Sequence, residues 1–161
     1  MSLVHKVGMA DLKICSSPDV LSTLGLGSCI GICLYDPGTK VSGLAHIMLP
    51  SSESIKNNSN IAKFADTAIV KLIDDMVKAG ANRRRLVSKI AGGAQMFAFS
   101  SQNDSMKVGQ RNAESVRKIL KDMNIPILAD DTGGNYGRTI EFYSDNGKLL
   151  IKTIGHGVKE V

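Results

Sequence analysis

Residues 28–48 read SCIGICLYDPGTKVSGLAHIM, and this stretch decides the fold. Two apolar segments flank Asp36-Pro37-Gly38-Thr39, in which proline presets φ for the first central turn position and glycine accepts a positive φ at the second. The stretch therefore predicts a β-hairpin. If the hairpin is symmetric about the Pro-Gly pair, large apolar residues face small ones, and Cys29 lies directly opposite His46. Opposite residues of an antiparallel pair have Cβ atoms about 4.5–5.5 Å apart, so we expect the thiol and the imidazole to meet.

The rest of the chain predicts an α+β fold in which helices pack on a largely antiparallel sheet. Apolar residues recur at helical spacing over residues 61–77, with Asn60 or Ser59 as the cap and Gly80 after the end. A second helix is predicted over Asn112–Met123. Short apolar runs bounded by turn residues predict strands. They are DLKIC, SCIGICLY, KVSGLAHIM, LVSKIAG, IPILAD, TIEFYS and KLLIKTI, and Asp145-Asn146-Gly147 predicts a hairpin between the last two.

Length and composition indicate an ordinary globular protein with one domain, residues 1–161. The chain is 43% hydrophobic and 22% charged, which is typical of that class. No apolar run is long enough to span a membrane, and the N-terminus MSLVHKVGMA lacks the apolar core of a signal peptide. We therefore expect a cytoplasmic protein that does not insert into membranes.

Cysteine count and charge narrow the function further. Three cysteines, none of them in a CxxC pair, argue against a disulfide framework and a structural zinc site. The formal net charge is +5, with a cluster at Arg83-Arg84-Arg85. A solvated basic face explains this charge most simply, and an acidic protein partner is the functional alternative. With four Phe, three Tyr and no Trp, the chain offers few platforms for base stacking, so we expect no nucleic-acid partner.

Cys29, His46 and Thr23 are the candidate catalytic residues. Only a thiolate is a strong nucleophile, and a nearby imidazole can take the thiol proton. Gly27 and Ser28 lead into Cys29, and backbone N–H groups of this loop can stabilise an oxyanion. Thr23 can orient the imidazole. The alternative is a buried cysteine that only packs; we adopt that interpretation for Cys15 and Cys33, and not for Cys29.

Several longer motifs resemble the chemoreceptor glutamine deamidases, the CheD family. They are TLGLGSCIGICLYDP, GLAHIMLP, KFADTAI, KIAGGAQMF, GQRNAESV and DDTGGNYGR, and the resemblance extends from about Leu24 to Lys152. It implies a Cys–His–Thr site with Cys29 as nucleophile, His46 as base and Thr23 as the orienting residue. It also implies a β-sandwich flanked by helices, similar to the catalytic domain of the cytotoxic necrotizing factor toxins.

The resemblance further implies hydrolysis of glutamine side-chain amides on the cytoplasmic helices of methyl-accepting chemotaxis proteins, through a cysteine thioester and without a metal or organic cofactor. Methyl-ester hydrolysis is a possible side activity, and a CheC-type chemotaxis phosphatase is the implied partner. The alternatives are a non-catalytic adaptor that docks on the phosphatase or the receptor, and a generic cysteine hydrolase or peptidase. The roles of Arg111, Asn112, Arg138, Gly133-Gly134 and His156 stay open at this point.

Overall fold

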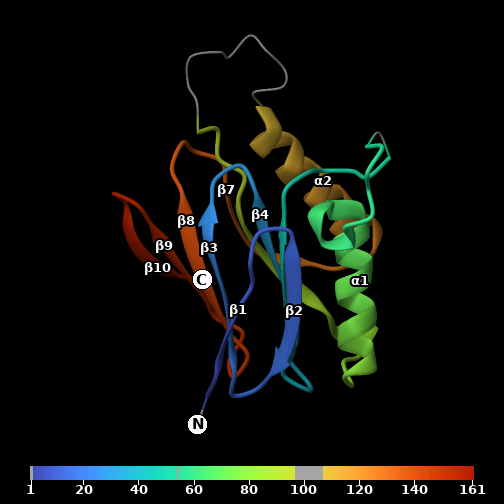
Figure 1. The fold of residues 1–161 in the computed structure, drawn as a ribbon. Helices are drawn as coiled ribbons and strands as arrows, with labels where there is room; N and C mark the ends of the chain where they lie inside the picture. Colours follow the sequence, from blue (N-terminus) through green and yellow to red (C-terminus); the bar gives the residue numbers. More distant parts are fainter. Residues whose placement is uncertain (1, 54, 97–106) are drawn as a thin grey trace.

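Two five-stranded sheets and two α-helices make up the fold (Figure 1). The structure, a computed structural model, describes residues 2–53, 55–96 and 107–161. One sheet has the strand order β1-β3-β8-β9-β10 and the other the order β2-β5-β4-β6-β7. The elements are β1 (Val4–Lys6), β2 (Asp11–Ser16), β3 (Val20–Leu26), β4 (Ile30–Asp36), β5 (Val41–Ile47), α1 (Ala65–Lys78), β6 (Val87–Gly92), α2 (Val108–Asp122), β7 (Ile127–Thr132), β8 (Arg138–Tyr143), β9 (Leu149–Thr153) and β10 (Gly157–Glu160), with 3₁₀ turns at Ile61–Lys63 and Arg83–Arg85.

The predicted α+β class and the largely antiparallel pairing are confirmed. Among the strands of the described residues, β1 pairs with β3 and β6 with β7 in parallel, and the other pairs are antiparallel. Figure 1 shows that both helices cover the same face of the β2-β5-β4-β6-β7 sheet, while the second sheet lies against the opposite face. The molecule is therefore layered as helices, sheet and sheet.

Side-chain alternation along β4 separates two hydrophobic cores. Ile30, Ile32 and Leu34 belong to the core beneath the helices, whereas Cys33 and Tyr35 belong to the core between the sheets. Successive residues of a strand point to opposite faces. Every residue of β4 and β5 is buried because both faces of this sheet are covered.

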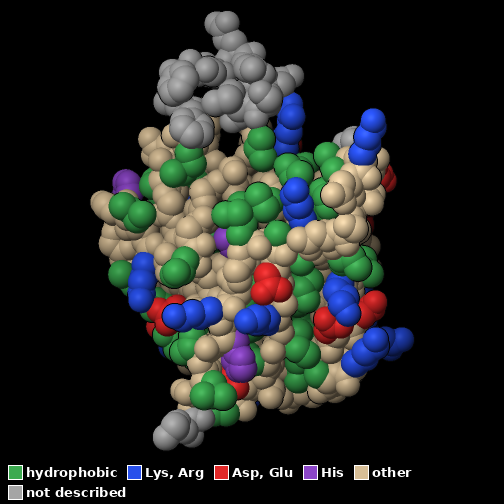
Figure 2. Space-filling view, viewed as in Figure 1, with side chains coloured by type: hydrophobic (Ala, Val, Ile, Leu, Met, Phe, Trp, Pro, Cys, Tyr) green, Lys and Arg blue, Asp and Glu red, His purple; other side chains and the backbone are tan. Residues whose placement is uncertain are grey.

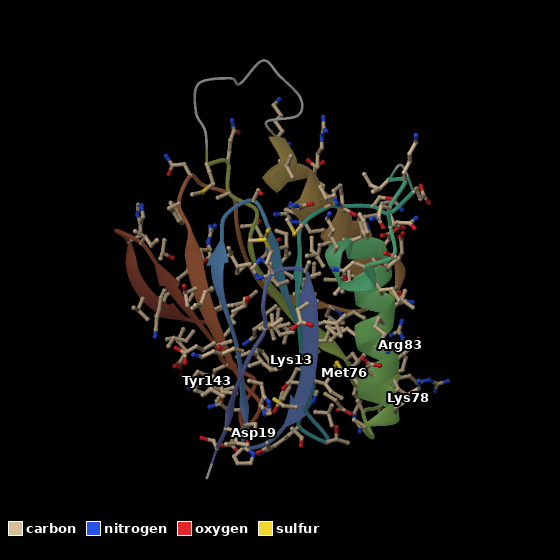
Figure 3. All side chains as sticks on the ribbon, in the orientation of Figure 1. Lys13, Asp19, Met76, Lys78, Arg83 and Tyr143 are labelled. Carbon is tan, nitrogen blue, oxygen red and sulfur yellow. The ribbon has the colours of Figure 1, made fainter. Side chains whose placement is uncertain are left out.

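Helix α1 approaches the sheet closely at a glycine of β5. A Cβ on Gly43 would lie 2.7 Å from Leu72 Cδ1 and 3.0 Å from Met76 Sδ, so a larger residue there would push the helix outward. Figure 3 shows Met76 pointing from α1 toward the sheet, whereas Lys78 and Arg83 point away from it. The apolar face predicted for residues 61–77 therefore packs on β5, and the basic side chains lie on the outside.

The predicted register of the β4–β5 hairpin is wrong by two residues. Asp36 pairs with Val41, so the loop holds four residues, and Lys40 closes it with φ 59°. His46 consequently lies opposite Gly31 and not opposite Cys29. Because side chains alternate with a period of two, this even shift leaves Cys29 and His46 on the same face.

Other boundaries differ in detail from the sequence prediction. Asn60 caps the 3₁₀ turn, where its side chain accepts a hydrogen bond from Ala62 N, and α1 proper begins at Ala65. Helix α2 begins at Val108, four residues before the predicted start. Strands β1, β3 and β10 were not predicted. In the described part of the chain, none of the helices is long and apolar enough to cross a membrane.

Candidate active site

The candidate residues gather where the chain crosses from one sheet to the other. Thr23 belongs to β3 of the first sheet, and His46 to β5 of the second. Cys29 lies in the short connection between β3 and β4, which is the crossing itself. Thr23 and His46 are buried, and Cys29 is 7% exposed. Residues from both sheets therefore meet at a crossing where all three candidate side chains are buried.

Two hydrogen bonds of Thr23 fix the tautomer of His46. Thr23 Oγ1 lies 2.6 Å from the carbonyl oxygen of Val7 and 2.7 Å from His46 Nδ1. A carbonyl only accepts, so the single hydroxyl hydrogen of Thr23 is donated to Val7. The hydroxyl oxygen must then accept from His46 Nδ1–H. In the neutral imidazole this leaves Nε2 without a hydrogen, as a proton acceptor.

The second ring nitrogen of His46, Nε2, is left without a hydrogen bond: it is buried and has no partner among the residues that the structure describes. Cys29 lies on the same face and is displaced by two positions from Gly31, the residue that faces His46. Such diagonal neighbours lie roughly 7–8 Å apart, so the thiol and the imidazole are adjacent but not hydrogen-bonded in this state.

Burial holds both groups neutral. Desolvation raises the pKa of the Cys29 thiol, although the residue's own backbone N–H works in the opposite direction. Desolvation also lowers the pKa of His46. Loss of water disfavours the charged form of each group. The resting site is therefore a neutral thiol beside a neutral imidazole, and not a preformed ion pair.

The loop before Cys29 presents two backbone donors next to the thiol. Gly27 N donates to Gly25 O at 3.1 Å and is engaged in this state. Among the described residues, no backbone carbonyl accepts from the N–H groups of Ser28 or Cys29. Within the described part of the chain, these two N–H groups therefore have no backbone acceptor.

A second turn, at the end of β6, holds the carbonyl groups of the same loop. Gly93 N donates to Cys29 O at 2.9 Å, and Ala94 N donates to Gly27 O at 2.8 Å. Gly92 has φ 114°, and a Cβ there would collide with the carbonyl oxygen of Cys29. The Gly92-Gly93 pair is required by close backbone approach, in agreement with the structural role that double glycines suggest.

Comparison with known proteins places this chain in one family. The family model described as "CheD chemotactic sensory transduction" matches residues 48–153. The "Probable chemoreceptor glutamine deamidase CheD" of Caldanaerobacter subterraneus subsp. tengcongensis is 60% identical over 160 residues, 99% of each chain. The chain belongs to the CheD family.

Two further similarities were found. The "Chemoreceptor glutamine deamidase CheD" of Halalkalibacterium halodurans is 52% identical to this CheD-family chain over 162 residues, and the alignment covers 100% of each protein. Among solved structures, the Bacillus licheniformis hypothetical protein YfiH aligns with TM-score 0.47 and 14% identity, covering 80% of this chain and 58% of that one.

Two buried polar side chains, Arg138 and Asn112, donate hydrogen bonds to the backbone around the candidate site of this CheD-family chain. Their roles could not be assigned from the sequence. Arg138 on β8 is buried; its Nη1 donates to the carbonyl oxygens of Gly92 (3.2 Å) and Gly133 (2.9 Å), and its Nη2 lies 3.4 Å from Asp131. Asn112 on α2 is also buried and donates to two backbone carbonyls near the site. The motifs DDTGGNYGR and GQRNAESV contain both residues, but only the fold shows what they contact.

Three exposed apolar side chains adjoin residues of the candidate site, in the sequence or in space. Leu24 follows Thr23 and is 68% exposed. Met9 is 59% exposed and precedes Ala10, whose N–H donates to His46 O. Met96 lies against Gly27. We call Met9, Leu24 and Met96 the apolar rim. Figure 2 shows hydrophobic side chains scattered over this face, with basic and acidic side chains side by side across its middle.

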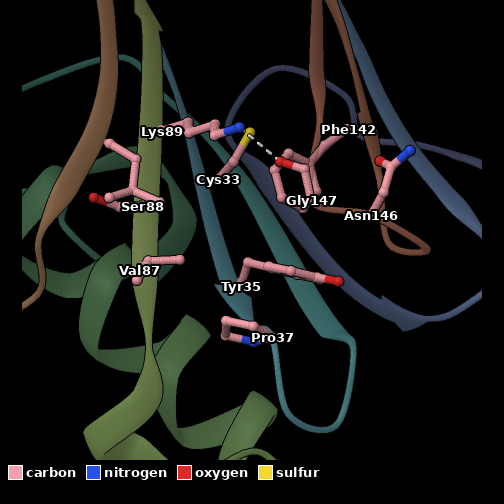
Figure 4. A pocket seen from close by; sticks show the side chains of 10 residues that line it. Cys33, Tyr35, Pro37, Val87, Ser88, Lys89, Phe142, Asn146 and Gly147 are labelled. Carbon is pink, nitrogen blue, oxygen red and sulfur yellow. Dashed lines mark hydrogen bonds between the residues drawn. The ribbon is translucent and has the colours of Figure 1, made fainter. Parts of the chain in front are cut away.

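Two other candidate side chains, Cys33 and His156, have different surroundings. Cys33 is fully buried and lines a separate cavity of about 210 Å³, where burial strongly raises the pKa of its thiol. Figure 4 shows it beside Lys89, whose Nζ donates to Gly147 O at 2.8 Å. The prediction that Cys33 packs as a small hydrophobe is confirmed. His156 is exposed, and its ring stacks on Tyr136 with centroids 4.3 Å apart.

Proposed function

We propose that this chain is a chemoreceptor glutamine deamidase that hydrolyses the side-chain amide of specific receptor glutamines to glutamate and ammonia. Membership in the CheD family supports the reaction, because relatives aligned over almost the whole chain carry that name. The observation that carries the chemistry is the hydrogen bond between Thr23 Oγ1 and His46 Nδ1, which leaves Nε2 free as a base beside Cys29.

In the first half of the reaction, His46 Nε2 takes the proton of the Cys29 thiol, and the thiolate attacks the amide carbon of the bound glutamine. The N–H groups of Ser28 and Cys29 bind the oxyanion that forms. One such donor contributes about 2.7–4 kcal/mol to lowering the barrier. Protonated His46 then gives its proton to the departing ammonia, and a thioester to Cys29 remains.

In the second half, His46 Nε2 removes a proton from a water molecule, which attacks the thioester. The C–S bond breaks, glutamate leaves, and the proton returns to the Cys29 sulfur. The same acyl chemistry extends to a glutamate methyl ester, with methanol replacing ammonia. Thr23 keeps Nδ1 protonated through both halves, since its oxygen accepts from that nitrogen.

The substrate is the cytoplasmic helical part of a chemoreceptor, and a CheC-type phosphatase is the proposed protein partner. The apolar rim suits an amphipathic helix, and the basic surface suits an acidic one. All three cysteines are free, and a working thiolate needs a reducing compartment. The proposed compartment is therefore the cytoplasm.

Incubation with a purified cytoplasmic receptor fragment tests the proposal. We expect ammonia release and a one-dalton gain at glutamine, abolished by Cys29→Ala. The matched control is Cys33→Ala, which removes a fully buried thiol outside the site and is expected to keep the activity of the folded protein. Ammonia release by Cys29→Ala at the wild-type rate overturns the nucleophile assignment.

The same experiment separates the two alternatives. A non-catalytic adaptor binds the fragment without ammonia release, both before and after the cysteine is replaced. A cysteine peptidase cleaves the backbone, so the fragment loses length and gains the mass of water across two products. Either result contradicts glutamine deamidation.

A further inference from the structure

One side chain on helix α2 connects the two backbone segments that carry the candidate nucleophile and base. Asn112 Nδ2 donates to Ser28 O at 2.9 Å and to Met48 O at 3.0 Å. Ser28 directly precedes Cys29, and Met48 follows His46 by two residues. Asn112 has an exposed fraction of 0%, so it cannot touch a substrate.

We propose that Asn112 is a positioning residue that fixes the distance between the Cys29 loop and the His46 strand. The proposal rests on the proposed function, in which these two residues react with each other. Both hydrogens of one planar amide group are used, and each bridges to a different catalytic segment. A planar NH₂ group has a fixed angle between its two N–H bonds. A shift of one segment relative to the other therefore breaks one of the two hydrogen bonds.

The surroundings of Asn112 show that the bridge is anchored to a rigid element. On α2, one turn before it, Gly109 lies so close to the turn after β6 that a Cβ would collide with Gly93 O and Ala94 O. That turn in turn bonds to the carbonyls of Gly27 and Cys29. Helix α2 therefore holds the Cys29 loop directly through the side chain of Asn112, and indirectly through the turn at Gly93 and Ala94 that packs against Gly109.

The amide oxygen of Asn112 gives an independent indication. Oδ1 is buried and has no hydrogen-bond partner among the described residues. Leaving a buried polar atom unsatisfied costs roughly 1–3 kcal/mol, and native structures rarely retain such atoms without a reason. A residue retained only for packing would not need this oxygen. The oxygen is part of the same amide as the NH₂ group, so its cost is explained if the two N–H bonds hold the reacting groups together.

The test compares Asn112→Asp and Asn112→Ser with Ser115→Ala. Asn112→Asp keeps the shape and removes both donors; Asn112→Ser keeps one short donor. Ser115, also on α2, donates from Oγ to Pro50 O at 2.9 Å, so Ser115→Ala removes a comparable hydrogen bond that does not reach Cys29. We expect kcat on the receptor fragment to fall about 10²-fold for both Asn112 variants, because small misplacement of reacting groups costs that much. KM should change less than threefold, and Ser115→Ala should keep wild-type kcat.

A second readout needs no substrate. The rate at which iodoacetamide alkylates Cys29 is followed against pH by peptide mass spectrometry. Because burial raises the pKa of this thiol, releasing its loop should lower the pH midpoint of alkylation in the Asn112 variants. A more reactive thiol in a slower enzyme is the signature of lost positioning; general destabilisation would affect Ser115→Ala as well.

Each outcome decides the question. An unchanged alkylation midpoint, or equal loss of kcat in Ser115→Ala at equal thermal stability, overturns the positioning role. If Asn112→Asp does not fold at 25 °C, Asn112→Ser is measured in its place. A wild-type kcat in Asn112→Ser, which keeps one donor, also overturns the positioning role. If the wild type releases no ammonia, the proposed function fails, and the alkylation midpoints still decide whether Asn112 holds the loop.

Discussion

Thr23 on one sheet accepts a hydrogen bond from His46 on the other sheet, across 2.7 Å. The sandwich therefore does more than provide a core, because its two layers each supply one member of the candidate site. The strand connection that carries Cys29 joins the same two layers. Any change in sheet packing at this end would alter the distances among all three side chains.

Replacing Thr23 with valine should slow the reaction without unfolding the protein. Valine has nearly the shape of threonine but cannot accept from His46 Nδ1–H, so the imidazole loses its fixed tautomer and orientation. We expect kcat to fall about 10²-fold, within the range by which general acid–base catalysis contributes. The measurement is ammonia release from the receptor fragment under saturating conditions.

Thr67 provides the control for this substitution. Its hydroxyl donates to Ile61 O at 2.6 Å, the same distance that separates Thr23 Oγ1 from Val7 O. Thr67→Val therefore loses a similar hydrogen bond far from the site, and kcat should stay within a factor of two. Equal kcat in Thr23→Val and the wild type would show that Thr23 does not orient the base.

Alkylation of the free enzyme should reveal a thiol with a raised pKa. Burial raises the pKa of Cys29 and lowers that of His46, so the neutral pair dominates near neutral pH. The rate at Cys29 should rise only as pH passes above the ordinary cysteine value of about 8.5. A plateau already reached at pH 6–7 would instead indicate a preformed thiolate–imidazolium pair and contradict the neutral resting state.

The face that Cys29 and His46 share could be predicted from the sequence, but the hairpin register could not. The alternation of apolar residues in β4 and β5 determines which face is buried. The register depends on the loop, where Asp36 Oδ1 accepts from Gly38 N and Lys40 adopts a left-handed conformation. A lysine with positive φ is uncommon, so Pro37-Gly38 suggested a shorter turn.

Strand β3 and the supporting residues could not be predicted for a different reason. Gly25 and Gly27 are typical of a loop, and β3 becomes a strand because β1 and β8 pair with its two edges. Asn112 and Ser28 are 84 positions apart in sequence. Local periodicity carries no information about such a contact, although the motif GQRNAESV marked the region.

Stability should depend on pH through the carboxylate that organises the hairpin loop. Asp36 is buried and accepts from Arg85, Asn82 N and Gly38 N, and these contacts lower its pKa well below the ordinary value. A lowered folded-state pKa stabilises the fold above the unfolded value of about 3.9, and this stabilisation is lost as pH falls below it.

Asp36→Asn should therefore lower the free energy of unfolding at pH 7 by about 2–4 kcal/mol, since it breaks a buried charged network. The difference from the wild type should shrink between pH 5 and pH 3. Urea titrations at both pH values measure it. Asp145→Asn is the control, because Asp145 is exposed and its nearest cation, Lys40 Nζ, lies 3.7 Å away. A constant difference across this range contradicts the assignment to Asp36.

Polar substitution on the apolar rim should weaken substrate binding and leave the chemistry intact. Leu24 and Met9 are exposed and touch the site only through their neighbours Thr23 and Ala10. Burying a large apolar side chain contributes about 1.5–3 kcal/mol. Leu24→Ser and Met9→Ser should each raise KM for the receptor fragment roughly tenfold, with kcat and the alkylation rate of Cys29 unchanged.

Leu128→Ser is the control, because Leu128 on β7 is 60% exposed and lines the separate cavity that contains Cys33. An equal rise in KM for Leu128→Ser, or no rise for either rim variant, would show that receptor helices do not bind across the rim.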